Sequence, residues 1–275
     1  MRANNVNELD AKEWLKFTKS WFLHNPPPRS EKEKLHPAKF PEDLVAKFIL
    51  FFTKKGDVVL DPFLGTGSTL VACGDTGRLG VGIELQERYA AIARERVKRQ
   101  AEQQLLGVEG AEKKGRRLVI RGDATQIDAL WKEHALPLVD FVITSPPYGP
   151  MLNKKGLAQK SREDDKLDTR YSDDVHDLGN VMDYDAFVAA LAGIFKKIKK
   201  ILKEGKYAVV IIQNYRDGGV YRTLAWDVGR ALSGDFTLVG ERLWLQDNKT
   251  LYPYGMGYSF VPNVHHHYCL IFKNV

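Results

Sequence analysis

The segment VVLDPFLGTGST at residues 58–69 decides the fold of this chain. Its first three residues are apolar and partly β-branched, which predicts a buried strand of a parallel sheet. Gly65 and Gly67 then predict a tight turn, because glycine accepts positive φ and lets the backbone approach a ligand closely. Residues 70–73 read as the start of a helix. The segment lacks both the full six-residue glycine pattern of dinucleotide-binding folds and the lysine of a phosphate-binding P-loop.

Three further strands are predicted to end beside this turn. Residues 79–83 lead into Glu84, about twenty residues after the glycines, a spacing that suits an acid holding ribose hydroxyls. The other two strands, at residues 117–120 and 139–144, lead into Gly122-Asp123-Ala124 and Ser145-Pro146-Pro147-Tyr148. Open α/β sheets bind their ligands at the carboxyl ends of the strands. The sequence therefore predicts a doubly wound α/β fold with a site at these four strand ends.

The turn Ser145-Pro146-Pro147-Tyr148 is rigid, because two consecutive prolines can neither continue a strand ladder nor enter a helix interior. It presents a hydroxyl, main-chain carbonyls and an aromatic ring. Such a set can accept hydrogen bonds from an exocyclic amino group while the ring stacks on a flat heterocycle. The alternative is a proline-rich loop that merely ends a strand.

Together these motifs make the chain resemble the S-adenosylmethionine-dependent amino-methyltransferases of nucleic acids. The resemblance lies at DPFLGTGST, GIEL, GDAT and TSPPY, and at HPAKFPEDL in residues 36–44. It covers about residues 35–150. It implies one Rossmann-like domain over residues 1–275, with a mostly parallel, seven-stranded sheet whose final hairpin includes residues 268–272. The motif wording resembles the β group of these enzymes, whereas the linear order is that of the γ group.

The resemblance also implies the roles of the site residues. S-adenosylmethionine is the expected cofactor, with Gly65 and Gly67 near its methionine part, Glu84 on its ribose and Asp123 on its adenine amino group. The full set of expected cofactor residues is His36, Phe40, Asp61, Pro62, Phe63, Gly65, Gly67, Ser68, Glu84, Leu85, Asp123 and Ala124. The expected catalytic residues are Ser145, Pro146, Pro147 and Tyr148. No metal is expected, since methyl transfer needs none and His265-His266-His267 has no Cys or acid at ligand spacing.

The expected substrate is the N4 amine of cytosine in DNA, in a base that is flipped out or single-stranded. Within this family a serine at the first position of the turn is typical of cytosine-N4 enzymes, and Asp or Asn of adenine-N6 enzymes. Methylation of cytosine N4 in ribosomal RNA and of adenine N6 in DNA remain open alternatives. A non-catalytic module that senses the cofactor is a further one, although it would not need Ser145 and Tyr148 on a rigid turn.

Composition agrees with one globular domain. The 275 residues suffice for one large α/β domain, and the net charge of +6 modestly favours a polyanionic partner. No stretch approaches the length of a membrane span, and the N-terminus lacks a signal pattern, so we expect a cytoplasmic protein. Cys73 and Cys269 lie in apolar runs and are expected to be buried free thiols.

Outside the motif region the sequence predicts the following elements. Residues 8–23 form an amphipathic helix, within an N-terminal extension and proline-rich linker at residues 1–35. Helices are expected at residues 42–53, 86–106, 184–202 and 220–233, and strands at 206–213, 236–245 and 268–272. The polar stretch at residues 149–183 is a candidate lid or target-recognition segment. The lysines at 196–203 are interpreted as a solvated helix face rather than a phosphate track.

Overall fold

A computed structural model of the protein describes residues 4–26, 40–106, 116–148, 177–217 and 219–275. The predictions on His36, on most of the proline-rich linker and on residues 149–176 of the polar stretch fall outside these ranges. Among the described residues, no helix is both long and apolar enough to span a bilayer.

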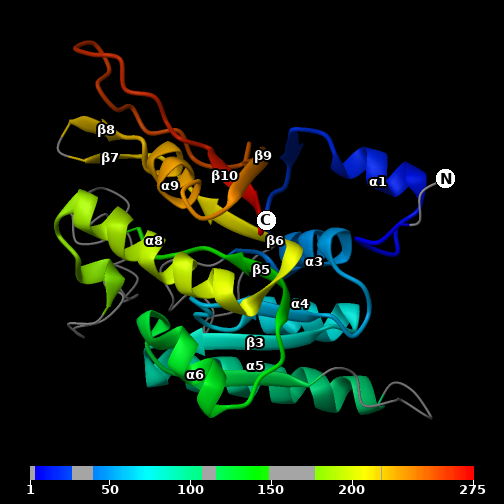
Figure 1. The fold of residues 1–275 in the computed structure, drawn as a ribbon. Coiled ribbons are helices and arrows are strands. Elements are labelled where there is room, and N and C mark those ends of the chain that lie inside the picture. The colour runs from blue at the N-terminus through cyan, green and yellow to red at the C-terminus, as the bar shows by residue number, and fades with distance from the viewer. Residues whose placement is uncertain (1–3, 27–39, 107–115, 149–176, 218) are drawn as a thin grey trace.

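The molecule is built around one twisted, mostly parallel sheet (Figure 1). In spatial order its strands are β1 (Trp21–Leu23), β9 (Thr237–Leu245), β10 (His266–Lys273), β6 (Leu202–Ile212), β5 (Val139–Thr144), β2 (Val58–Asp61), β3 (Leu79–Glu84) and β4 (Arg117–Arg121). Neighbouring strands are parallel, except that β10 runs antiparallel to both β9 and β6. The doubly wound α/β class, the adjacency of the four motif strands and the final hairpin β9–β10 are therefore confirmed.

The sheet has eight strands, so the expected number of seven was wrong. The extra strand is β1, which was predicted to be the end of an N-terminal helix. Helix α1 covers only Ala11–Phe17, and Trp21–Leu23 then pair in parallel with residues 243–245 of β9. The helical spacing of the aromatic residues is a local signal. The unpaired edge of β9 offers hydrogen-bonding partners from over 200 residues away, and no local signal shows it.

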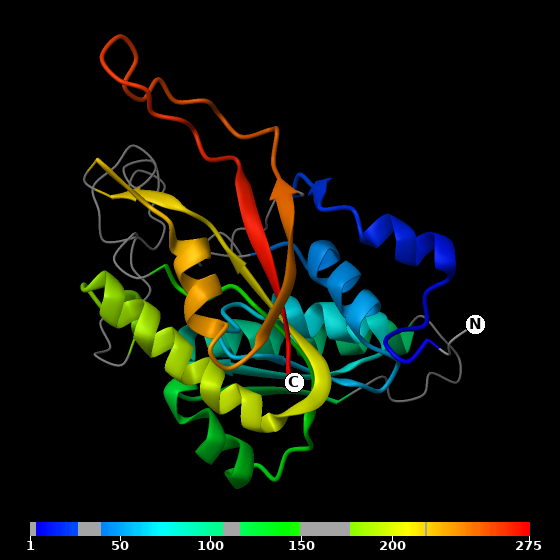
Figure 2. The same ribbon diagram turned by 45° about the horizontal axis from the view of Figure 1, so that its top comes forward.

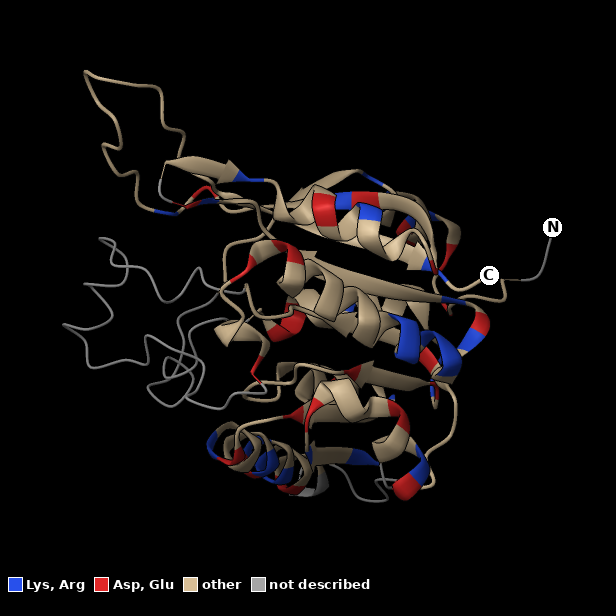
Figure 3. Cartoon of the chain, turned by 60° about the vertical axis from the view of Figure 1, so that its left-hand side comes forward, with Lys and Arg blue, Asp and Glu red and all other residues tan. Residues whose placement is uncertain are grey.

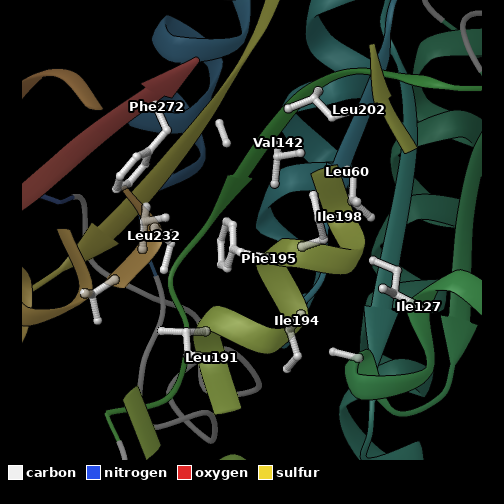
Figure 4. Close-up of a cluster of buried hydrophobic side chains, with 14 of the residues drawn as sticks. Leu60, Ile127, Val142, Leu191, Ile194, Phe195, Ile198, Leu202, Leu232 and Phe272 are labelled. Carbon is white, nitrogen blue, oxygen red and sulfur yellow. The ribbon is translucent and has the colours of Figure 1, made fainter. Parts of the chain in front are cut away.

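Helices cover both faces of the sheet. One face carries α3 (Glu42–Phe52), α4 (Ser68–Thr76) and α5 (Glu87–Leu106), and the other carries α6 (Ile127–Glu133), α8 (Tyr184–Ile201) and α9 (Leu224–Leu232). Successive strand residues alternate between the two cores, as the pleat requires. Val59 and Phe141 pack with the α3 side, whereas Leu60 and Val142 pack against α8 (Figure 4).

Three short elements complete the described fold. They are the 3-10 turns η1 (Ala124–Gln126) and η3 (Leu178–Asn180) and a small hairpin of β7 (Tyr215–Asp217) with β8 (Val220–Arg222). The helix predicted for residues 220–233 therefore begins later, at Leu224, because residues 220–222 pair with β7.

The N-terminal segment packs on the body through its aromatic side chains. The Phe17 ring stacks on Phe51 with centroids 3.9 Å apart, and the Arg242 guanidinium of β9 lies 4.0 Å from the Phe17 ring centroid. Arg242 also donates a hydrogen bond from Nε to the carbonyl of Lys19. These contacts pack the partly buried Phe17 against the core on the α3 side. Trp21 is 44% exposed, with the Lys19 ammonium over its ring.

Three lysines at the end of α8 and the start of β6 bond the protein itself. Lys197 donates to the Thr125 carbonyl, Lys199 to the Asp235 carbonyl and Lys203, in β6, to the carboxylate of Asp140. Because α8 runs directly into β6, this end of the helix lies at the amino edge of the sheet, on the side of the C-terminus in Figure 3. Their contacts with the protein itself argue against a phosphate track.

Both cysteines are buried free thiols, as predicted. Burial raises the pKa of Cys73 well above its usual range and that of Cys269 to about 12. Neither thiol is therefore ionised near neutral pH.

Candidate active site

A pocket opens where β2, β3, β4 and β5 end. The lining residues come from the end of β3, from the segments that follow these four strands, and from α5, η3 and α8: Pro62, Phe63, Ile83, Glu84, Leu85, Gln86, Tyr89, Gly122, Asp123, Ala124, Ser145, Pro147, Asp177, Leu178 and Ile194. The predicted convergence of the four strand ends is thus present in the structure.

Asp61 ties two of these strand ends together. Its side chain is fully buried and accepts hydrogen bonds from Thr144 Oγ1 at 2.6 Å and from Thr69 Oγ1 at 2.5 Å. A third bond comes from the Phe63 backbone N–H at 3.1 Å. Burial raises the pKa of this carboxyl to about 6, although the three donors oppose that shift. Asp61 therefore fixes the end of β5 against the start of α4.

The glycine turn brings its backbone against both a carboxylate and a helix. Gly65 N–H donates to Glu84 Oε2 at 2.8 Å. Gly67 has a φ of +92°, and a Cβ at this position would lie 2.9 Å from the Cβ of Ala93 in α5. A side chain there would be strained by its backbone conformation and would also collide with α5. The turn can therefore take this path only with glycine at position 67.

Glu84 is the most strongly perturbed acid that lines the pocket. Its second oxygen, Oε1, accepts the Gln86 N–H at 2.8 Å, so two backbone donors hold the carboxylate. Burial raises its pKa to about 7, against these two hydrogen bonds, and the nearby charges of Asp177 and Asp61 act in the same direction as burial. Such a residue can change protonation near neutral pH when a ligand binds beside it.

Two further acids stand around the pocket. The Asp123 carboxylate accepts from Thr125, through the backbone N–H at 2.8 Å and through Oγ1 at 2.6 Å. Asp177 accepts from the Gly179 N–H at 2.8 Å and begins η3. Sequence reasoning did not single out Asp177, which belongs to the polar stretch at 149–183. A local signal existed, since Asp followed two residues later by Gly is typical of an Asx turn.

Only two of the four residues of the proline turn, Ser145–Tyr148, line the pocket. Ser145 and Pro147 line it, whereas Pro146 and Tyr148 do not. The Tyr148 ring is only 6% exposed and belongs to the core beneath the turn. Burial raises the pKa of its hydroxyl to about 12, and a hydrogen bond with the Ser145 side chain opposes that shift. The turn thus offers a serine hydroxyl to the pocket and has an aromatic side chain packed underneath.

The other predicted cofactor residues that the structure describes do not line the pocket. Asp61, Gly65 and Gly67 form the loop described above. Phe40 is buried in the core on the α3 side, and Ser68 is buried at the first turn of α4. Among the residues that the structure describes, none is a hydrogen-bonding partner of the Ser68 or Thr66 hydroxyl. Around His265, His266 and His267 the described residues contain no group of three or more metal-ligating side chains.

Residues 3–95 match the DNA methylase family of N6/N4 methyltransferases. Over these residues the chain is similar to the N6/N4 DNA methylases. It is 43% identical over 67 residues to the Type II methyltransferase M2.DpnII of Streptococcus pneumoniae, covering 24% of this chain and 25% of that protein. It is 38% identical over 81 residues to the orphan methyltransferase M.BamHII of Bacillus amyloliquefaciens, covering 28% of this chain and 31% of that protein. The similarity thus spans less than a third of the length of either relative.

Among solved structures, TrmN from Thermus thermophilus aligns with a TM-score of 0.49 at 16% identity, covering 85% of this chain and 48% of that one. No substrate follows from a similarity of this size.

The N6/N4 DNA methylase family uses S-adenosylmethionine, and the described residues fit this cofactor. The pocket combines apolar walls such as Phe63 with the carboxylates of Glu84 and Asp123, which can accept hydrogen bonds from ribose hydroxyls and an adenine amino group.

Proposed function

We propose that this protein transfers a methyl group from S-adenosylmethionine to the exocyclic N4 amine of cytosine in DNA. The observation that carries the proposal is the shared pocket of Ser145, Pro147, Glu84 and Asp123. An acceptor suited to an amine therefore lies in the same cavity as the acids suited to a nucleoside. The family match described above covers residues 3–95, which include Glu84.

The turn acts on the amine. The exocyclic amine of cytosine is a poor nucleophile, because its lone pair is delocalised into the ring. Acceptors aimed at its two hydrogens favour a pyramidal nitrogen whose lone pair points outward. In the proposal the Ser145 hydroxyl and the Pro146 carbonyl are these acceptors, and the rigid proline pair holds them in place.

The pocket walls act on the methyl donor. When bound, S-adenosylmethionine supplies an electrophilic methyl group on a sulfonium that leaves readily. Glu84 accepts hydrogen bonds from ribose hydroxyls, Asp123 accepts from the adenine amino group, and Pro62 and Phe63 cover an apolar face. These contacts align the donor and exclude water, so the protein contributes mainly orientation and desolvation.

Tyr148 has two possible roles in this proposal, and they differ in what they require. Stacking of its ring on the target base, a contact worth about 1–3 kcal/mol, requires that the buried ring become exposed. Support of Ser145 through the phenol hydroxyl requires no movement, because that contact is already made.

The test is a nucleoside analysis by mass spectrometry. The protein is incubated with S-adenosylmethionine carrying a labelled methyl group and with duplex DNA, single-stranded DNA or ribosomal RNA, and each acceptor is digested to nucleosides. Labelled N4-methylcytosine from DNA supports the proposal. Label only in N6-methyladenine would show that the target base is adenine and not cytosine. Label only in RNA would show that the acceptor is RNA and not DNA. Label in no nucleic acid would refute the proposed function.

A further inference from the structure

Between β9 and β10 the chain forms a long projection over residues 248–264, which we name the aromatic arm (Figure 2). Its large apolar side chains are exposed to an unusual degree: Tyr258 is 98% exposed, Phe260 88% and Met256 75%. Proteins rarely keep such side chains in water without a binding partner. None of these residues contributes to the pocket described above.

Internal contacts give the arm a defined shape. The Asn263 side chain bonds the Tyr252 backbone in both directions, accepting its N–H at 3.0 Å and donating to its carbonyl at 2.9 Å. At the tip, the N–H groups of Tyr258 and Ser259 both donate to the Gly255 carbonyl at 2.9 Å. Gly255 has a φ of +67°, and a Cβ there would lie 2.4 Å from the Ser259 carbonyl oxygen. The backbone of the arm is thus held by its own hydrogen bonds. The exposed rings therefore belong to a segment of defined shape.

Topology places the base of the arm at the edge of the sheet that carries the pocket. β9 runs in the same direction as β5 and β6, because β10 is antiparallel to both β9 and β6. β9 therefore ends, and the arm begins, at the carboxyl edge, where Ser145 follows β5. The small hairpin of β7 and β8 leaves β6 at this same edge (Figures 1 and 2).

The chemistry of the arm fits a nucleic acid. Residues 248–264 contain no Asp or Glu and one Lys, Lys249, so they present no negative charge to a phosphate backbone. Exposed aromatic rings stack on bases of any sequence, and apolar side chains can enter an opened base step. A base that reacts on its exocyclic amine must first leave its stack, which leaves neighbouring bases uncovered.

We propose that the aromatic arm binds the nucleic acid next to the target base, with Tyr258 and Phe260 covering bases that the extruded nucleotide leaves unstacked. This proposal rests on the proposed function, because it needs a nucleic acid as the acceptor. It adds the element that grips the acceptor, which is separate from the residues that bind the methyl donor.

The test compares Tyr258→Ala/Phe260→Ala with the wild type and with Leu138→Ala. Leu138 is a large exposed apolar residue that precedes β5, at the opposite edge of the sheet, so its variant is the matched control. Fluorescence anisotropy measures binding to a labelled mixed-sequence duplex and to the same duplex with one unpaired cytosine. Calorimetry measures S-adenosylmethionine binding, and the labelled-methyl assay measures transfer.

The double variant should bind the duplex at least about tenfold more weakly, as expected for the loss of two stacking contacts. Its loss on the duplex with an unpaired cytosine should be smaller, because less opening is needed there. Cofactor affinity and the slope of binding against salt concentration should not change, since no ionic contact is removed. Leu138→Ala should match the wild type in every measurement.

Wild-type duplex affinity in the double variant overturns the arm proposal and leaves the proposed function standing if the wild type transfers methyl groups. A wild type that neither binds nor methylates any nucleic acid overturns both. A double variant that keeps duplex affinity but changes from dimer to monomer in light scattering assigns the arm to a second copy of this chain and also overturns the proposal.

Discussion

Two carboxylates at adjacent strand ends, Asp61 and Glu84, show how neighbouring acids come to serve different purposes. Asp61 accepts three hydrogen bonds from its own chain and has no exposed surface, so it acts on the geometry of the loops. Glu84 accepts two backbone bonds and still lines the pocket. Glu84 is therefore available to a ligand, whereas Asp61 is not.

The raised pKa of Glu84 predicts how cofactor binding depends on pH. Burial raises it to about 7, and only the ionised carboxylate is a pure acceptor for ribose hydroxyls. Affinity for S-adenosylmethionine should rise as the pH passes through about 7, and Glu84→Gln should bind more weakly and lose this dependence. Calorimetry across that interval measures both. A wild-type affinity independent of pH would remove Glu84 from the binding site.

The same shift affects stability in the absence of cofactor, with the opposite sign. The folded-state pKa of Glu84 lies above its ordinary value of 4.5. Protonation of Glu84 therefore stabilises the folded protein, and this contribution is fully present below a pH of about 4.5. This contribution is lost as the pH rises through about 7. Glu84→Gln, which cannot ionise, should show a smaller fall in the free energy of unfolding over this range.

Substitutions at Ser145 and Tyr148 are predicted to affect methyl transfer much more than cofactor binding. Ser145→Ala should leave cofactor affinity nearly unchanged and lower kcat steeply, because alignment of the amine acts on the transition state. Tyr148→Phe should be milder than Tyr148→Ala, which also leaves a cavity beneath the turn. Steady-state kinetics with calorimetry separates the two quantities. Wild-type turnover by Tyr148→Ala would mean that this turn only ends a strand.

At the level of elements, the central strands could be predicted because both of their faces are buried. The runs in β2, β3 and β5 are almost continuously apolar, and each ends in a motif. Two other elements depend on partners distant in sequence. β1 forms against β9, and Asp177 meets Glu84 only once η3 is folded beside the pocket. The β7–β8 hairpin had a local signal, Asp217 followed by two glycines, but residues 220–222, which form β8, were assigned to a helix.

The hydrogen bond from Thr144, at the end of β5, to Asp61, at the end of β2, predicts a difference between two similar variants. Thr144→Val and Thr69→Val each leave Asp61 with one donor fewer, so each should lower the free energy of unfolding by about 1–3 kcal/mol. Only Thr144 adjoins the proline turn, so Thr144→Val should lower methyl transfer further. Urea unfolding and the transfer assay test the pair, and equal transfer by both would separate Asp61 from the alignment of the turn.

Across the whole molecule, the pocket and the aromatic arm lie at one edge of the sheet, and a group of lysines that bond the protein itself lies toward the other edge. The pocket and the aromatic arm lie at the carboxyl edge, while Lys197, Lys199 and Lys203, near the junction of α8 with β6, bond the protein itself. These three lysines therefore contribute to the net charge of +6 without placing their charge beside the pocket.

Arg242 is predicted to hold the N-terminal segment on the body. It bonds the Lys19 carbonyl and lies over the rings of Phe17 and Phe22. Arg242→Ala should lower the free energy of unfolding by about 1–3 kcal/mol, since a hydrogen bond from a charged donor and cation–π contacts are lost. Arg216→Ala, on the exposed face of β7, is the control. Equal thermal midpoints for the two variants would show that Arg242 does not anchor this segment.

The two buried thiols have a practical consequence. Alkylating dyes react with thiolates, and neither Cys73 nor Cys269 is exposed or ionised near neutral pH. These are the only cysteines of the chain. A cysteine introduced at Ser259, in the tip of the aromatic arm, would thus be the single site of modification in the folded protein. A fluorophore attached there would follow the approach of nucleic acid in real time, with no need to remove either native cysteine.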